Sequence, residues 1–198
     1  PLAALLLTLG LAACGGKASY DVSGTISGLN NEGLILANGG ESLPIAAGKT
    51  SFTFAKRIDY GTEYNITFKQ QPAHMTCNIV GGSGSAGHYV NISAAVSCSQ
   101  NVYTVGGTIS GLTVDGLVLI NGNTQTTVAK DATAFTMAGP VADGATYNVS
   151  VFTQPKDLLC VVQPGTGVGT MGSANITTVQ IACNPARARG TVAAARLP

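Results

Sequence analysis

A ten-residue segment occurs twice in this chain of 198 residues, and its spacing constrains the fold more than any other feature. YDVSGTISGL begins at Tyr20 and YTVGGTISGL begins at Tyr103, so the two copies lie 83 positions apart. Later residues repeat at the same distance: Gln71 and Gln154, Pro72 and Pro155, Cys77 and Cys160. A long fixed period indicates tandem copies of one structural unit. We therefore expect two homologous modules, residues 20–100 and 101–184.

Composition and charge narrow the classes of partner. The chain is 45% hydrophobic and only 10% charged, against about 25% charged residues in an average soluble domain. Between Tyr20 and Cys183 there are nine acidic and six basic residues, which gives the modules a net charge of −3. A nucleic-acid-binding surface needs a cluster of basic residues. We therefore expect no nucleic-acid partner. We also expect no cofactor, because no motif indicates one.

The first 13 residues, PLAALLLTLGLAA, are apolar but too short to span a bilayer. They are typical of the hydrophobic part of an export signal, and we expect the printed chain to begin inside that signal peptide. Leu11-Ala12-Ala13-Cys14 resembles a bacterial lipobox. The resemblance implies cleavage before Cys14, lipidation of Cys14 and a short tether over residues 14–19. An ordinary signal peptide followed by an unrelated cysteine is the alternative.

Four cysteines remain when Cys14 is set aside, and they allow three pairings. Each copy of a repeat has to be able to close itself. We therefore expect the disulfides Cys77–Cys98 and Cys160–Cys183, which close similar separations of 21 and 23 residues. Oxidation agrees with export. A zinc site is disfavoured because the chain has no CxxC motif and no nearby histidine pair.

Alternating apolar and polar residues predict about seven short strands in each module. The expected strands are 20–27, 34–36, 43–45, 51–54, 64–68, 75–80 and 90–98 in the first module, and 103–109, 116–120, 126–128, 134–137, 147–152, 158–162 and 176–183 in the second. This pattern predicts an all-β chain of two tandem sandwiches, Ig-like or transthyretin-like. The chain has no Trp, unlike antibody domains. Each disulfide should join the last two strands as a hairpin.

The repeated pattern is YxVxGTxSGL, then GLxLxNxG, DGxxYxVxVxxQP and two cysteines. It resembles a module found in tandem in bacterial cell-envelope lipoproteins and secreted multidomain proteins. The resemblance covers about residues 20–184 and departs at Tyr60, where the second copy has Asp143. It implies an extracytoplasmic Ig-like spacer or interaction domain and no catalytic residues. Residues 185–198 match no part of the repeat, and we expect a disordered tail.

Two glycine-rich segments match GxGxxG, at residues 82–87 and 167–172. In a dinucleotide-binding fold this motif joins a strand to a helix. Here strand-like sequence follows each copy, so we expect glycine loops between strands. The acidic residues are scattered and form no calcium-binding motif, so we expect no metal site.

A site present in one module only should have no counterpart 83 positions away. His74, His88, Tyr60 and Tyr89 meet this criterion in the first module. Tyr60 and Tyr89 are the residues expected to form a contact surface. Four other tyrosines occupy matched strand positions and are expected in the core: Tyr20, Tyr64, Tyr103 and Tyr147.

These features predict a non-catalytic, lipid-anchored protein of the bacterial cell envelope that acts as a spacer or an adhesion module. The expected location is the outer membrane, facing the periplasm or the cell surface. Its expected partners are the membrane, through the lipid, and an unidentified protein or polysaccharide. The alternative is part of a secreted hydrolase whose catalytic portion lies outside this chain or at the module interface.

Overall fold

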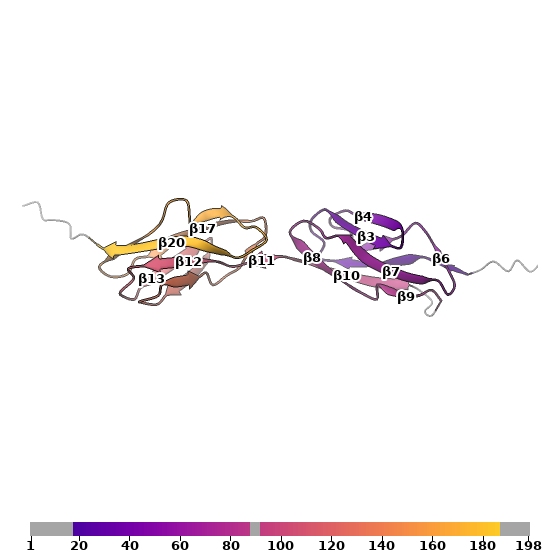
Figure 1. Cartoon of the computed structure of the whole chain (residues 1–198), viewed down its shortest axis with the longest axis horizontal. Coiled ribbons are helices and arrows are strands. Elements are labelled where there is room, and N and C mark those ends of the chain that lie inside the picture. The colour runs from indigo at the N-terminus through magenta and orange to yellow at the C-terminus, as the bar shows by residue number, and fades with distance from the viewer. Residues whose placement is uncertain (1–17, 88–91, 187–198) are drawn as a thin grey trace, which may run out of the picture. The chain divides into compact units, whose positions relative to one another are not determined.

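The computed structural model describes residues 18–87 and 92–186, and every regular element in those ranges is a β-strand (Figure 1). The described residues divide into two compact units. The first holds the residues up to Ala73 together with Cys77–Cys98, and the second holds His74–Thr76 with the residues from Ser99 onwards. Within these ranges there is no helix long and apolar enough to cross a membrane.

The first unit contains two four-stranded sheets, ordered β5-β2-β10-β8 and β4-β3-β7-β9, and a two-stranded ribbon of β1 and β6. The ten strands are β1 (Ser19–Tyr20), β2 (Val22–Ser27), β3 (Leu34–Asn38), β4 (Glu41–Ile45), β5 (Ser51–Thr53), β6 (Ile58–Asp59), β7 (Glu63–Gln70), β8 (Met75–Val80), β9 (Ser83–Ser85) and β10 (Ile92–Gln100).

The second unit repeats this arrangement, with sheets β15-β12-β20-β18 and β14-β13-β17-β19 and a ribbon of β11 and β16. Its strands are β11 (Val102–Tyr103), β12 (Val105–Ser110), β13 (Leu117–Asn121), β14 (Thr124–Val128), β15 (Ala134–Thr136), β16 (Val141–Ala142), β17 (Thr146–Thr153), β18 (Leu158–Val162), β19 (Val168–Thr170) and β20 (Ile176–Pro185). Strands β11 to β18 each begin 83 positions after their counterparts. Strand β19 begins two positions later than that offset, which accounts for the longer separation of the second cysteine pair.

Burial alternates along the strands, which places one face of each sheet in the core. In β2, Val22 and Ile26 are buried while Thr25 and Ser27 are exposed. In the second unit a single apolar cluster takes residues from both four-stranded sheets, among them Val105, Ile109 and Ile181 from one sheet and Leu117, Leu119 and Val149 from the other. Two sheets that share one core form a sandwich. The expected fold class, an all-β chain of two tandem β-sandwich modules, is confirmed.

The strand order differs from that of an immunoglobulin constant domain. Such a domain places its strands A and B in the same sheet, whereas β2 and β3 lie in different sheets here. The first and last long strands of each unit are parallel neighbours, β2 with β10 and β12 with β20. The first and last long strands of each unit therefore hydrogen-bond to each other within one sheet.

The disulfides Cys77–Cys98 and Cys160–Cys183 are present in the structure, and this is the pairing that the repeat predicts. Each bond joins neighbouring strands of one sheet, and Cys160 lies directly opposite Cys183. The joined strands are not a simple hairpin, contrary to expectation, because β9 and β19 intervene and belong to the opposite sheet. Both intervening strands lie in the segments expected to be glycine loops. Their short Ser-Gly and Val-Gly sequences carry too little apolar alternation to indicate a strand.

Candidate functional site

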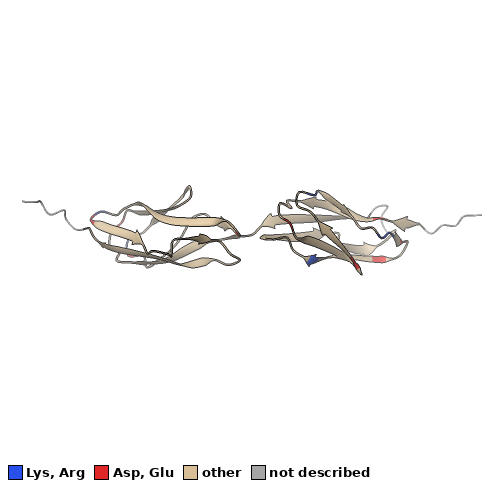
Figure 2. Cartoon of the chain, turned by 90° about the horizontal axis from the view of Figure 1, so that it is seen from above, with Lys and Arg blue, Asp and Glu red and all other residues tan. Residues whose placement is uncertain are grey.

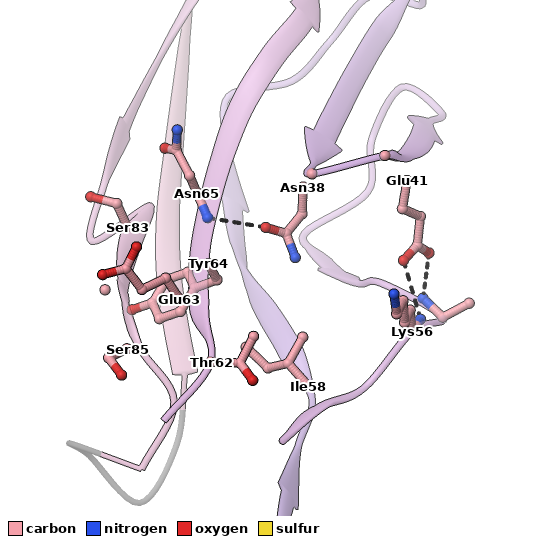
Figure 3. A pocket seen from close by; sticks show the side chains of 14 residues that line it. Asn38, Glu41, Lys56, Ile58, Thr62, Glu63, Tyr64, Asn65, Ser83 and Ser85 are labelled. Atoms are coloured by element: carbon pink, nitrogen blue, oxygen red, sulfur yellow. Dashed lines mark hydrogen bonds between the residues drawn. The ribbon is translucent and has the colours of Figure 1, made fainter. Parts of the chain in front are cut away.

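A surface groove of about 1080 Å³ lies in the first unit. Its walls are the β3–β4 turn, the chain between β5 and β6, the start of β7 and the short strand β9 (Figure 3). The lining is mixed, with charged side chains at Glu41, Lys56 and Glu63 and hydroxyl groups at Thr62, Ser83 and Ser85, among others. A groove of this size can accept a small ligand or a segment of a polymer.

Two hydrogen-bonded side chains of the β3–β4 turn shape one wall of the groove (Figure 3). The Glu41 carboxylate accepts bonds from the backbone N–H groups of Ala55, at 2.7 Å, and Lys56, at 3.2 Å. The Asn38 amide oxygen accepts a bond of 3.0 Å from the backbone N–H of Asn65. These bonds attach the turn to β7 and to the β5–β6 connection, so the wall is built before any ligand arrives.

Tyr64 supplies an aromatic surface in the groove. It pairs with Gly84 of β9 across the sheet, and its ring lies over that glycine. The side chain is half-buried. A residue larger than glycine at position 84 would push the Tyr64 ring away from the sheet. The glycine therefore sets the position of the aromatic ring beside the hydroxyl groups.

The charges of the groove belong to the first module alone. At 83 positions further along, Thr124 stands for Glu41, Gly139 for Lys56 and Thr146 for Glu63. The scaffold contact of the turn is kept in both copies, since the Asn121 amide oxygen accepts a 2.8 Å bond from the backbone of Asn148. Figure 2 marks the charged positions of both units. A functional site present in one module only should have no counterpart 83 positions away, and the charged residues of the groove meet that condition.

Glu41, Lys56 and Glu63 are a second set of first-module residues, besides the histidines and tyrosines, that have no like counterpart in the other copy. The comparison at 83 positions leaves all three without a charged counterpart, and the same is true of Asp21, Lys49, Arg57, Asp59 and Lys69. The common location of Glu41, Lys56 and Glu63 was not predictable, because the groove is assembled by strands that are distant in the sequence.

Tyr60 is exposed, with 68% of its surface accessible, and its ring lies over Gly87. It is not among the residues that line the groove. Tyr89, His88 and Cys14 lie outside the described residues. Of the four tyrosines expected in the core, only Tyr147 is buried.

The other three, Tyr20, Tyr64 and Tyr103, are half-buried. Tyr20 and Tyr103 belong to the two-stranded ribbons, and Tyr64 forms part of the groove. Their rings therefore lie at the margins of the sandwich.

His74 lies in the second compact unit, where its Nδ1 atom is 2.9 Å from Oδ1 of Asp143. The His74 side chain is half-exposed and the Asp143 side chain is almost fully covered. His74 and its counterpart Asp157 both have left-handed backbone conformations, with φ of 61° and 59°. The matched conformation indicates that both residues hold the turn before β8 and β18. Among the described residues, no group of three or more His, Cys, Asp or Glu side chains could hold a metal ion.

No family model matches the chain, and no curated protein matches it either. Among solved structures, the chain is similar to a mutant of the shaft pilin SpaA from Lactobacillus rhamnosus GG. The identity is 12%, the match covers 85% of this chain and 99% of the pilin chain, and the TM-score is 0.32. A similarity of this size assigns neither a family nor a function. The class that the structure itself defines is a tandem of two disulfide-bonded β-sandwich modules.

Proposed function

We propose that this chain is a non-catalytic protein of the bacterial cell envelope and that the groove of the first unit is its binding site. The observation that carries the proposal is the presence of two charged side chains, Lys56 and Glu63, in the groove of one copy only. Residues that hold the sandwich together are needed in both copies, whereas binding residues are needed only where the ligand binds. The second module then acts as a spacer.

A polysaccharide is the partner that the groove chemistry favours. Sugar hydroxyl groups both donate and accept hydrogen bonds, and the hydroxyls of Thr62, Ser83 and Ser85 can do the same. The Tyr64 ring provides a flat apolar surface against which the C–H face of a sugar ring can pack. Lys56 adds a donor group and Glu63 adds an acceptor group to the lining.

The binding test compares two doubly substituted proteins that change charge equally. Lys56→Ala with Glu63→Thr alters the groove, whereas Lys49→Ala with Glu32→Thr alters exposed residues outside it. Both proteins would be titrated with purified envelope polysaccharides. We expect the groove variant to bind about tenfold more weakly or worse, since a hydrogen bond to a charged group contributes about 1.5–3 kcal/mol. The control should bind as the unaltered protein does.

Equal binding by the two variants would contradict the proposed site. Capture of a protein partner with no polysaccharide binding would contradict the ligand class. Turnover of any substrate in a hydrolase panel would contradict the non-catalytic assignment.

The envelope location rests on two features. Each unit carries its own disulfide, and such bonds persist in oxidising compartments outside the cytosol. The lipobox-like segment before Cys14 supports attachment to the outer membrane through several acyl chains, which hold a protein stably where one chain does not. Labelled fatty acid should enter the unaltered protein and not the Cys14→Ser variant, and the variant should leave the membrane fraction. Equal membrane retention without label would contradict the anchor.

A further inference from the structure

Strand β18 lies at the edge of its sheet, and the side chain of Gln154 bonds the backbone of its middle residue, Cys160. The Cys160 N–H donates a bond of 2.8 Å to Oε1 of Gln154, and Nε2 of Gln154 donates a bond of 2.9 Å to the Cys160 carbonyl oxygen. The first module has the same clamp on its edge strand β8, where Gln71 bonds Cys77 at 2.8 and 3.2 Å. This geometry explains the glutamine of the repeated Gln-Pro motif.

The two backbone groups of Cys160 point to the open side of the sheet. Cys160 lies directly opposite Cys183, and directly opposed residues in an antiparallel pair either exchange both backbone bonds or exchange none. Both polar groups of Cys160 bond the Gln154 side chain, so this pair exchanges none. Gln154 therefore occupies the central positions through which an added strand would bond β18.

The outward-facing side chains differ between the two edges. In β18 they are Leu159 and Val161, which are 53% and 49% exposed. The matching residues of β8 are Thr76 and Asn78, which are also exposed. Strand β18, with the sequence LLCVV, carries no charge. At these two matched positions the second module thus presents apolar side chains where the first module presents polar ones.

The geometry points to the β18 edge as a surface for strand addition by a second copy of this chain. Gln154 opposes this addition, because its side chain already bonds the backbone groups of Cys160. Two β18 strands related by a twofold axis can pair antiparallel with Cys160 opposite its copy. The Cys160 N–H and carbonyl groups then bond each other in place of Gln154. In the same register Leu159 faces Val161 of the other copy, so each apolar pair is made twice. No charges oppose one another within the paired strands.

Sedimentation velocity of the Gln154→Ala variant over a concentration series tests the inference, which does not depend on the groove. In the unaltered protein, pairing has to displace the two Gln154–Cys160 hydrogen bonds of each copy, four in the dimer. We expect their removal to raise the dimer association constant about tenfold or more. The matched control is Gln71→Ala, which opens the polar edge of β8 and should leave the association constant unchanged. Adding Leu159→Thr and Val161→Asn to Gln154→Ala should return association to the unaltered level, because these residues copy Thr76 and Asn78.

Circular dichroism and a free-thiol assay establish that each variant is folded and oxidised. Should Gln154→Ala not fold, Gln154→Asn serves instead, since the shorter amide cannot reach both groups of Cys160. Association of the folded opened variant no stronger than that of the unaltered protein would overturn the inference. Dimerisation of Gln71→Ala to the same extent would also overturn the inference, because Leu159 and Val161 would then have no role in the association.

Discussion

The Tyr64 ring lies across Gly84 of the neighbouring strand, and a Cβ atom on that glycine would come within 2.8 Å of the tyrosine hydroxyl. The second module repeats the relationship with Tyr147 and Gly169, where the distance would be 2.7 Å. The second glycine of each GxGxxG segment is therefore needed for an aromatic side chain to cover the sheet. This role is structural and explains why the motif occurs in both modules.

Alanine at Gly169 should destabilise the second unit by about 1–3 kcal/mol, the usual cost of overpacking a well-packed site. The Tyr147 ring is buried and has little room to move. Gly172 of the same motif is the matched control, because a Cβ atom there meets nothing within 4 Å. Urea unfolding followed through the amide signals of the second unit measures both variants. Equal stability losses at the two positions would contradict the packing explanation.

Gly111, in the repeated TISGL segment, combines a φ of +75° with a Cβ direction blocked by the carbonyl oxygen of Cys183. Gly122 has a φ of +58° and open space around it. Gly122→Ala should cost about 1 kcal/mol from the backbone conformation alone. Gly111→Ala should cost about 3 kcal/mol or more, since backbone atoms have to move as well. The two free energies of unfolding are compared under one set of conditions, and a larger loss for Gly122→Ala would contradict this account.

Replacing Cys77 and Cys98 by alanine should lower the stability of the first unit by about 3 kcal/mol, the chain-entropy value for a loop of this length. The bridge closes a separation of 21 residues inside that unit. The unfolding midpoint of the second unit should stay where it is, because its own bridge is intact. Residue-resolved unfolding by NMR separates the two transitions. A matching loss in the second unit would show that the units do not fold independently.

The repeat predicted most of the long strands because their side chains alternate, as in β2 and β12. It missed short strands such as β6, β9 and β16, which have two or three residues each and too few apolar side chains to show a period. The parallel pairing of β2 with β10 was also not predictable, since sequence patterns indicate which face is buried and not which strand lies alongside.

The candidate site shows the same limit. Comparing the two copies marks Glu41, Lys56 and Glu63 together with five other charged residues of the first module, and their shared groove depends on how β3, β7 and β9 come together. Tyr60 also lacks a counterpart and lies outside the groove lining, and its role in a contact surface stays a prediction. A residue that differs between copies therefore indicates a site only when the fold gathers several of them.

The most direct test of the central claim is an amide NMR titration of the whole chain with solubilised envelope polysaccharide. We predict that signals shift at the groove, in particular at Asn38, Tyr64 and Gly84, and that the matched signals of Asn121, Tyr147 and Gly169 stay in place. Equal shifts in both modules, or shifts in neither groove region, would contradict the assignment of the binding site to the first unit.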